Sequence, residues 1–247
     1  MPVRLEIRPF PAAINLALRV RFYLWALVIL CPAGLSFAAA QPAPPAPAAR
    51  FVVVIDAAHG GDDPGGRING TDEKTLTLAL SVRLRSLLAA RGIQVVTTRE
   101  SDATIDPNRR AELANHANAQ ACLSLHATQS GTGAHLFVSS LSPAQPARIA
   151  AWKTAQAVWV TRSLALAGTL NSALLHAGLT VSMARSALPA VESMTCPAVA
   201  VEIAPETAQA RDSGQQTPGS LDDPNYQARI AEALAAALIQ WRTEARP

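Results

Sequence analysis

The segment FVVVID, residues 51–56, is a run of five apolar residues that ends in an aspartate. A strand with one face in water alternates apolar and polar residues, whereas a continuous apolar run indicates a strand buried on both faces. Burial on both faces requires helices on each side of the sheet, as in parallel α/β proteins. The segment therefore predicts an α/β fold.

The rest of the chain alternates helical and strand-like patterns. Residues 73–92 carry leucines on one helical stripe, with Thr71 or Asp72 available as a cap and Gly92 as a stop. Further strands are predicted at 93–98, 121–128, 133–140 and 196–204, and further helices at 107–119, 147–177 and 226–242. This order predicts a single α/β domain with a mostly parallel or mixed central sheet flanked by helices on both faces.

Residues 1–40 have the features of a secretory signal peptide. A basic stretch ends at Arg21, the apolar segment FYLWALVIL follows, and Ala38 and Ala40 offer a cleavage site. Residues 41–50 form a proline- and alanine-rich spacer, and we expect residues 51–247 to be the folded domain. The protein is thus expected to be exported, to the periplasm or cell envelope. If the segment is retained, it would serve as a membrane anchor instead.

The net charge of +3 comes from this N-terminal segment. Of the 21 basic and 18 acidic residues, four and one lie in residues 1–40, which leaves 17 of each sign. Bulk charge therefore gives no reason to expect a nucleic acid partner or an anionic lipid surface. After cleavage the chain would keep Cys122 and Cys196. Both lie in apolar, strand-like segments, which favours buried free cysteines over a disulfide.

Polar side chains stand where the predicted strands end. His59 follows the first strand, His126 ends a second, and Glu202 lies late in the last. Glu73 opens the first long helix, after a glycine-rich loop. In parallel sheets the carboxyl ends of strands meet at one edge, so these groups can converge there. Two imidazoles and a carboxylate are a common ligand set for catalytic zinc, and a second carboxylate can act as general acid or base.

Each of these residues also has a simpler explanation. Glu73 suits the first turn of a helix on electrostatic grounds alone, and a histidine at a strand end is often only packed or hydrogen bonded. Glu202 could pair with an arginine, since a buried carboxylate needs a partner. Among the other histidines, His135 begins a strand and could contact the site or its substrate. The residue types by themselves leave both explanations open.

The motifs around these residues resemble those of the zinc-dependent N-acetylmuramoyl-L-alanine amidases of bacterial cell-wall turnover (amidase type 3). IDAAHGGDDPGG stands in place of the family's strand followed by Asp-Pro-Gly-His-Gly-Gly and Asp-Pro-Gly, with Ala57 and Ala58 replacing Pro-Gly. The further matches, in family order, are EK, GIQVVTTRESD, RAELAN, SLHAT and PAVAVE. Six motifs in order are far more specific than any one of them, and they span residues 52–202.

The resemblance implies the chemistry and the roles of the residues. His59, Glu73 and His126 would bind one Zn²⁺ per chain, and Glu202 would be the catalytic acid/base. The substrate would be peptidoglycan or a muropeptide, cleaved at the amide bond between N-acetylmuramic acid and the L-alanine of the stem peptide. Some relatives are controlled by a protein partner, but this sequence does not identify one.

Departures from the family pattern concern the substrate more than the chemistry. Thr128 replaces an asparagine, EIAPE at 202–206 replaces Glu-Leu-Gly-Phe, and Glu192 stands about where many members carry an arginine. The preferred muropeptide and the roles of Glu192 and His135 stay open. Two alternative functions also stand: an exported zinc peptidase that cuts within the stem peptide, and a non-catalytic periplasmic protein that binds the wall.

Overall fold

A computed structural model of the chain describes residues 50–146, 152–206 and 219–244. The predicted signal peptide, the spacer up to residue 49 and the start of the predicted helix at 147–177 lie outside these ranges. The strands are β1 (Val52–Ala57), β2 (Arg67–Ile68), β3 (Thr71–Asp72), β4 (Gln94–Thr97), β5 (Ala121–Ala127), β6 (Ala134–Ser139), β7 (Val181–Ser186) and β8 (Ala198–Ile203). The helices are α2 (Glu73–Ala89), α3 (Pro107–His116), the 3₁₀ helix η1 (Trp152–Val158), α4 (Val160–His176), α5 (Pro189–Glu192) and α6 (Pro224–Glu244).

Six of the strands form one sheet in the order β4-β1-β5-β8-β6-β7. The pairs β1–β4, β1–β5, β5–β8 and β6–β7 are parallel, whereas β6 runs antiparallel to β8. The carboxyl ends of β1, β5 and β8 therefore lie at one edge of the sheet, and β6 begins there. The predicted mostly parallel or mixed sheet is confirmed.

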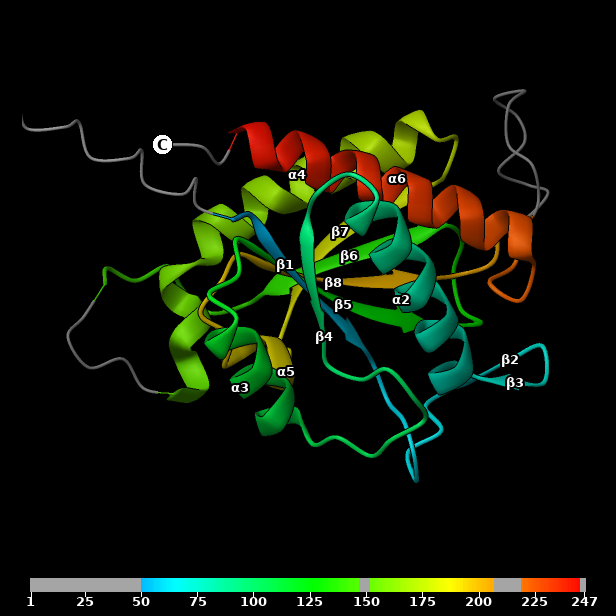
Figure 1. Ribbon diagram of the computed structural model, residues 1–247, viewed down its shortest axis with the longest axis horizontal. Coiled ribbons are helices and arrows are strands. Elements are labelled where there is room, and N and C mark those ends of the chain that lie inside the picture. The colour runs from blue at the N-terminus through cyan, green and yellow to red at the C-terminus, as the bar shows by residue number, and fades with distance from the viewer. Residues whose placement is uncertain (1–49, 147–151, 207–218, 245–247) are drawn as a thin grey trace, which may run out of the picture. The chain divides into compact units, whose positions relative to one another are not determined.

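Helices cover both faces of the sheet (Figure 1). The larger hydrophobic core packs alternate residues of β1, β5 and β8 against α2, α4 and α6. A smaller core on the opposite face joins the first halves of β1 and β5 to residues of α3 and to Val191 of α5. Because both faces of β1 are covered, all six of its residues are buried, as its continuous apolar sequence predicts.

Local signals set the ends of the helices that flank the site. Asp106 caps α3 by accepting hydrogen bonds from the backbone N–H groups of Asn108 and Arg109, and Pro107 occupies the first turn. In α2 the N-cap residue is Asp72, but its side chain makes no capping hydrogen bond. The acid in the first turn of α2, Glu73, instead turns into the site. Within the described residues, no helix is long and apolar enough to span a membrane.

The sequence did not predict β7, α5 or the small β2–β3 hairpin. β7 is the edge strand next to β6, and four of its six residues are exposed. It therefore lacks the apolar pattern by which buried strands are recognised. The β2–β3 hairpin pairs two residues on each side, and α5 contains four. Segments this short carry too few residues for a periodic signal.

Cys122 and Cys196 form a disulfide, which corrects the expectation that they are free. The sulfur atoms are 2.02 Å apart, and the two residues are separated by 74 positions in the sequence. Cys122 lies in β5, and its N–H donates to the carbonyl of Pro197, just before β8. The crossover between neighbouring parallel strands brings the two cysteines together. Their apolar surroundings predicted burial correctly but gave no information on this pairing.

Candidate metal centre and neighbouring carboxylate

The four site residues predicted from the sequence all lie at the carboxyl edge of β1, β5 and β8. His59 stands two residues after β1, His126 is the last but one residue of β5, and Glu202 is the last but one of β8. Glu73 is the first residue of α2. In the sheet register His126 pairs with Glu202, so these two residues lie side by side on neighbouring strands. The topology thus brings together residues that are up to 143 positions apart.

His59, Glu73 and His126 form a compact group whose candidate ligand atoms all lie within 4.8 Å of one another. The Glu73 carboxylate stands between the two imidazoles. His59 Nε2 is 3.1 Å from Oε2 of Glu73, and His126 Nδ1 is 3.1 Å from Oε1. The two rings are nearly perpendicular, with centroids 5.5 Å apart. Each imidazole therefore turns one nitrogen toward the same small space.

The His59 ring is fixed by Asp63 and by the absence of a side chain at Gly65. Asp63 Oδ2 accepts a hydrogen bond of 2.8 Å from His59 Nδ1, so Nε2 is the nitrogen left to bind a ligand. A Cβ on Gly65 would stand 2.6 Å from the His59 ring and 2.7 Å from Oε2 of Glu73. Gly65 also has a φ of +66°. Only a glycine fits this position, and it allows the loop to close over both side chains.

His126 is oriented by a hydrogen-bond chain that starts at a buried carboxylate. Asp56 accepts from the Ser124 hydroxyl at 2.7 Å, which leaves the Ser124 oxygen free to accept from His126 Nε2 at 3.4 Å. This arrangement holds Nε2 against Ser124 and turns Nδ1 toward Glu73, where a bound metal would take the place of a proton on Nδ1. The N–H of Ala127 donates to Oε1 of Glu73 at 3.0 Å, which ties the carboxylate to the end of β5.

The surroundings shift the pKa values of His59 and Glu73 in opposite directions. The Glu73 hydrogen bond, opposed by partial burial and aided by Asp63, raises the pKa of His59 to about 8. Burial on its own would raise the pKa of Glu73, but hydrogen bonds from His126, His59 and two backbone N–H groups outweigh it and hold that pKa well below its usual range. Glu73 is thus kept as an anion, the form in which a carboxylate binds a metal.

Buried arginines hold the loop that carries His59. His59 has a φ of +61°, a left-handed conformation that costs a non-glycine residue roughly 1 kcal/mol or more. Arg110 donates to the His59 carbonyl at 2.6 Å and to Asp56 at 2.6 Å. Arg99 donates to the carbonyls of Ala57 and Ala58 at 2.9 and 3.0 Å. These contacts fix the backbone on both sides of the turn and so determine where the imidazole points.

The donor set suits a divalent metal ion of the zinc type. Two neutral imidazole nitrogens and a carboxylate are the protein ligands of one class of catalytic zinc site. In both histidines the ring nitrogen that faces away from Glu73 donates its N–H to an oxygen, of Asp63 or of Ser124, as in most metal-binding histidines. The residues present therefore fit a bound cation without rearrangement of the sheet.

Glu202 lies beside this group but is not part of it. Its side chain is 33% exposed, so water and substrate can reach the carboxylate. Its Oε2 accepts a hydrogen bond of 3.1 Å from Nδ1 of His135 in β6, and not from an arginine. His135 therefore contacts Glu202, one of the two possibilities that the sequence left open. Glu192, whose role was also open, lies elsewhere: its carboxylate is near Ser139, at the far end of β6.

Several residues that support the site were not identified from the sequence. Asp56, Asp63, Arg99 and Arg110 all lie inside the motifs that carry the family resemblance. Their position in those motifs could have indicated a supporting role. For Asp56 there was a further indication, because an aspartate that ends a buried strand needs a buried partner. The identity of that partner could not be read from spacing, since Asp56 and Arg110 are 54 residues apart.

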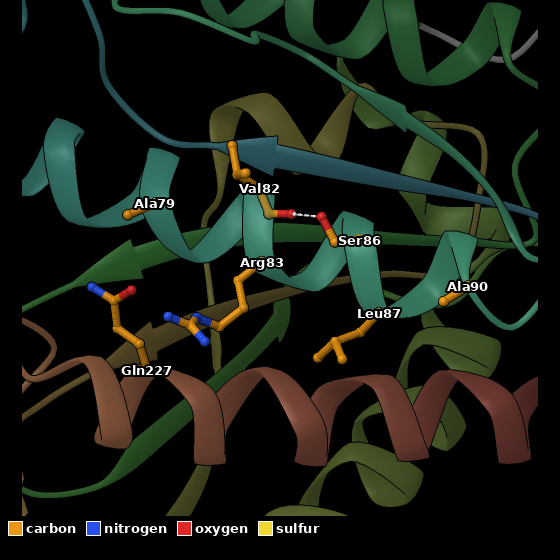
Figure 2. A pocket seen from close by; sticks show the side chains of 7 residues that line it. All are labelled: Ala79, Val82, Arg83, Ser86, Leu87, Ala90 and Gln227. Carbon is orange, nitrogen blue, oxygen red and sulfur yellow. Dashed lines mark hydrogen bonds between the residues drawn. The ribbon is translucent and has the colours of Figure 1, made fainter.

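A separate hollow of about 650 Å³ lies on the outer surface of α2 and α6 (Figure 2). It is lined by Ala79, Val82, Arg83, Ser86, Leu87, Ala90 and Gln227. Five of these residues come from α2 and Ala90 directly follows it, and none belongs to the polar group at the sheet edge. Its walls are mostly apolar and carry no pair of groups suited to acid–base or metal chemistry. The chemistry of the protein is therefore to be sought at the sheet edge.

Comparisons with known proteins identify a family and several individual relatives. The family model described as N-acetylmuramoyl-L-alanine amidase matches residues 53–240. A sporulation-specific N-acetylmuramoyl-L-alanine amidase from Bacillus subtilis is 38% identical over 89 residues, which cover 35% of this chain and 35% of that protein. The N-acetylmuramoyl-L-alanine amidase AmiA from Escherichia coli is 38% identical over 97 residues, covering 37% of this chain and 33% of that protein. The matches thus span about a third of the length of these curated relatives.

The solved structures show that the fold is shared. The catalytic domain of the amidase CwlV from Bacillus (Paenibacillus) polymyxa var. colistinus superposes with a TM-score of 0.60 and 24% sequence identity. That alignment covers 78% of this chain and 98% of the other. At this identity the likeness establishes the architecture only. The family model, which matches well over half of the residues, establishes the relationship: this chain belongs to the N-acetylmuramoyl-L-alanine amidase family.

Proposed function

We propose that this protein is a zinc-dependent amidase that cleaves the bond between N-acetylmuramic acid and the L-alanine of peptidoglycan stem peptides. The observation that carries the proposal is the group His59–Glu73–His126, with Glu202 next to it in the sheet register, in a chain of this family. Two imidazoles and a carboxylate would hold one Zn²⁺, and an exposed carboxylate beside them is placed to move protons.

The residues divide the work between metal binding and proton transfer. A zinc ion held by His59, Glu73 and His126 would supply Lewis acidity, which polarises an amide carbonyl and lowers the pKa of water toward ~7. Glu202 accepts the proton of the attacking water and donates it to the leaving amine nitrogen, so the carboxylate is regenerated in each cycle. The partial exposure of Glu202 suits this role, since both water and the scissile amide must approach it.

We also propose that the protein acts outside the cytoplasm. The signal-like segment at 1–40 and the spacer at 41–50 favour export of a catalytic domain that spans residues 51–247. Peptidoglycan is found in that compartment, and the disulfide between Cys122 and Cys196 is of a kind that persists there. A regulatory protein partner stays a prediction from the family resemblance.

Digestion of purified peptidoglycan tests the proposal. We expect release of stem peptides with an L-alanine amino terminus from intact glycan strands, and we expect a chelator to abolish it. Glu202→Ala should abolish release while zinc content stays near one ion per chain. Glu232→Ala, at an exposed position of α6, serves as a matched control and should behave as the unmodified protein.

Other products would favour the alternative functions. Cleavage between residues of the stem peptide would indicate a peptidase. Binding to peptidoglycan without any product, with zinc present, would indicate a wall-binding protein. Zinc content that is unchanged in His59→Ala would contradict the ligand assignment.

A further inference from the structure

We infer that His135 is a positioning residue for Glu202: its Nδ1–H holds one carboxylate oxygen and so fixes the direction of the other. The inference rests on the proposed function, in which Glu202 moves the protons of the reaction. It concerns the surroundings of Glu202, on the side away from the metal group. Residues 202–206 depart from the family pattern there, so the family motif does not indicate what holds the carboxylate.

The sheet places the two residues opposite each other. β6 runs antiparallel to β8, and His135 is the register partner of Glu202. Glu202 is at the same time the register partner of His126 in β5. Register partners point to the same face of a sheet, so His126, Glu202 and His135 form a row across three strands. The backbone thus places a histidine on each side of the carboxylate, one in the metal group and one outside it.

The hydrogen bond between His135 and Glu202 has a defined direction. Nδ1 of His135 is 3.1 Å from Oε2 of Glu202, and a carboxylate oxygen can only accept, so Nδ1 carries the proton. Among the described residues, His135 is the one side-chain hydrogen-bond partner of this carboxylate. A glutamate with a third of its side chain exposed has several accessible rotamers. The contact with His135 selects among them.

The histidine ring is itself restrained on its opposite edge. A Cβ on Gly131 would stand 2.7 Å from Nε2 of His135 and even nearer to Cε1. The loop before β6 therefore passes directly against the ring and requires a glycine there, at a φ of +83°. The ring is 18% exposed and lies between this backbone and the Glu202 carboxylate. A restrained donor can restrain its acceptor, which is the property a positioning residue needs.

The test compares two variants of equal shape, His135→Asn and His135→Leu. The asparagine amide can donate from nearly the position of Nδ1, whereas leucine has the same branched shape and no donor. For the zinc-loaded full chain acting on a soluble muropeptide, we expect His135→Leu to lower kcat about 10- to 50-fold with KM little changed, as for loss of a hydrogen bond to a charged group. His135→Asn should keep kcat within about threefold of the unmodified protein, since the donor is retained.

Zinc content and thermal unfolding are measured on both variants, and both should match the unmodified protein. If the leucine variant does not fold, His135→Ala takes its place, because it too removes the donor. Equal kcat for the leucine, asparagine and unmodified proteins would overturn the inference. So would an equal loss in the two folded, zinc-loaded variants, since this would assign the effect to ring packing. An unmodified protein that releases no L-alanine-terminated peptide would instead contradict the proposed function.

Discussion

The site has two halves that are held in different ways. The β1 half contains the His59 loop and the group His59–Glu73–His126, and the β8 half contains Glu202. On the β1 side, buried charges and backbone hydrogen bonds fix the loop around His59: Asp56 contacts Thr98, Arg110 and Ser124, and Lys74 bridges Gly61 and Asp102. On the β8 side, the strand register places Glu202, and one hydrogen bond from His135 orients its carboxylate.

The contrast agrees with the role proposed for each half. A loop with left-handed residues has no intrinsic preference for its shape, so its conformation must be imposed by many contacts. A strand residue is already placed by the ladder and needs only the orientation of its side chain. Rigid placement suits groups that bind a metal, whose ligand geometry tolerates little error, whereas partial exposure suits a carboxylate that exchanges protons with water and substrate.

The roles of the two halves are distinguished most clearly by making the same substitution, glutamate to glutamine, in each half. Glu73→Gln should lower zinc affinity by more than about 100-fold, the upper range for residues that only orient a ligand, and activity should be lost with the metal. Glu202→Gln should lower kcat by about 10²- to 10⁴-fold, as for loss of a general acid/base, with zinc still bound. Metal analysis beside muropeptide kinetics distinguishes the two. Loss of zinc from the Glu202 variant would mean that the halves are not separate.

The dependence of the β1 half on buried charge can be tested with neighbouring arginines. Arg110→Ala should lower the free energy of unfolding by about 3–5 kcal/mol, because it leaves the Asp56 carboxylate buried and without its cation. Arg109→Ala is the control: Arg109 is exposed and pairs with Glu112 at the surface, so the expected loss is below about 1 kcal/mol. Denaturant unfolding measures both values. Similar losses for the two variants would contradict the role given to Arg110.

The disulfide joins β5, which carries His126, to the segment just before β8, which carries Glu202. Its reduction, or substitution of both cysteines by alanine, should cost about 2–4 kcal/mol, since the bond closes a loop of 74 residues in the unfolded chain. The bond lies near the start of β5 and β8, away from the site. Zinc affinity of the folded protein should therefore change little. Unfolding curves with and without reductant, followed by a zinc titration, test both statements.

The smallest expected effect is a pH dependence that belongs to the metal-free protein. The pKa of His59 is raised to about 8 from 6.5, so its contribution is fully present below pH 6.5 and is lost as pH rises through about 8. The lowered pKa of Glu73 acts in the opposite range, and its contribution is lost only as pH falls below 4.5. Between pH 6.5 and 8.5, Tm of the metal-free protein should fall by about 1–3 °C, after allowance for solvent screening.

His59→Asn tests the source of this slope. The variant should unfold with a Tm that is nearly constant over the same pH range once the contributions of the exposed groups are subtracted. A His116→Asn control, at an exposed position at the end of α3, should retain the slope. A slope that persists in the His59 variant would place the titrating group elsewhere.

Much of the fold was predictable because its central strands are buried on both faces. β1, β5 and β8 are mostly apolar segments, and α2 and α6 give clear helical patterns. The edge strand β7 gives no such pattern, because it is exposed and its backbone pairs with β6 alone. Burial creates the sequence signal, so the least buried elements were the ones that were missed.

The site divides along the same line. Residue types and motif order predicted that His59, Glu73, His126 and Glu202 meet at one edge of the sheet, since parallel strands bring their carboxyl ends together. The residues that orient these four side chains are determined by contacts between segments that are distant in the sequence. The Arg110–Asp56 pair and the His135–Glu202 contact each join residues more than 50 positions apart.

The sequence by itself determined the fold class and the family and indicated which side chains form the candidate site, because burial patterns and short motifs are local properties of the chain. The tertiary structure decided that the cysteines pair, that His135 faces Glu202, and that two buried arginines fix the His59 loop. These facts depend on sheet order and register. They are set by the packing of the whole domain, and no local stretch of sequence encodes them.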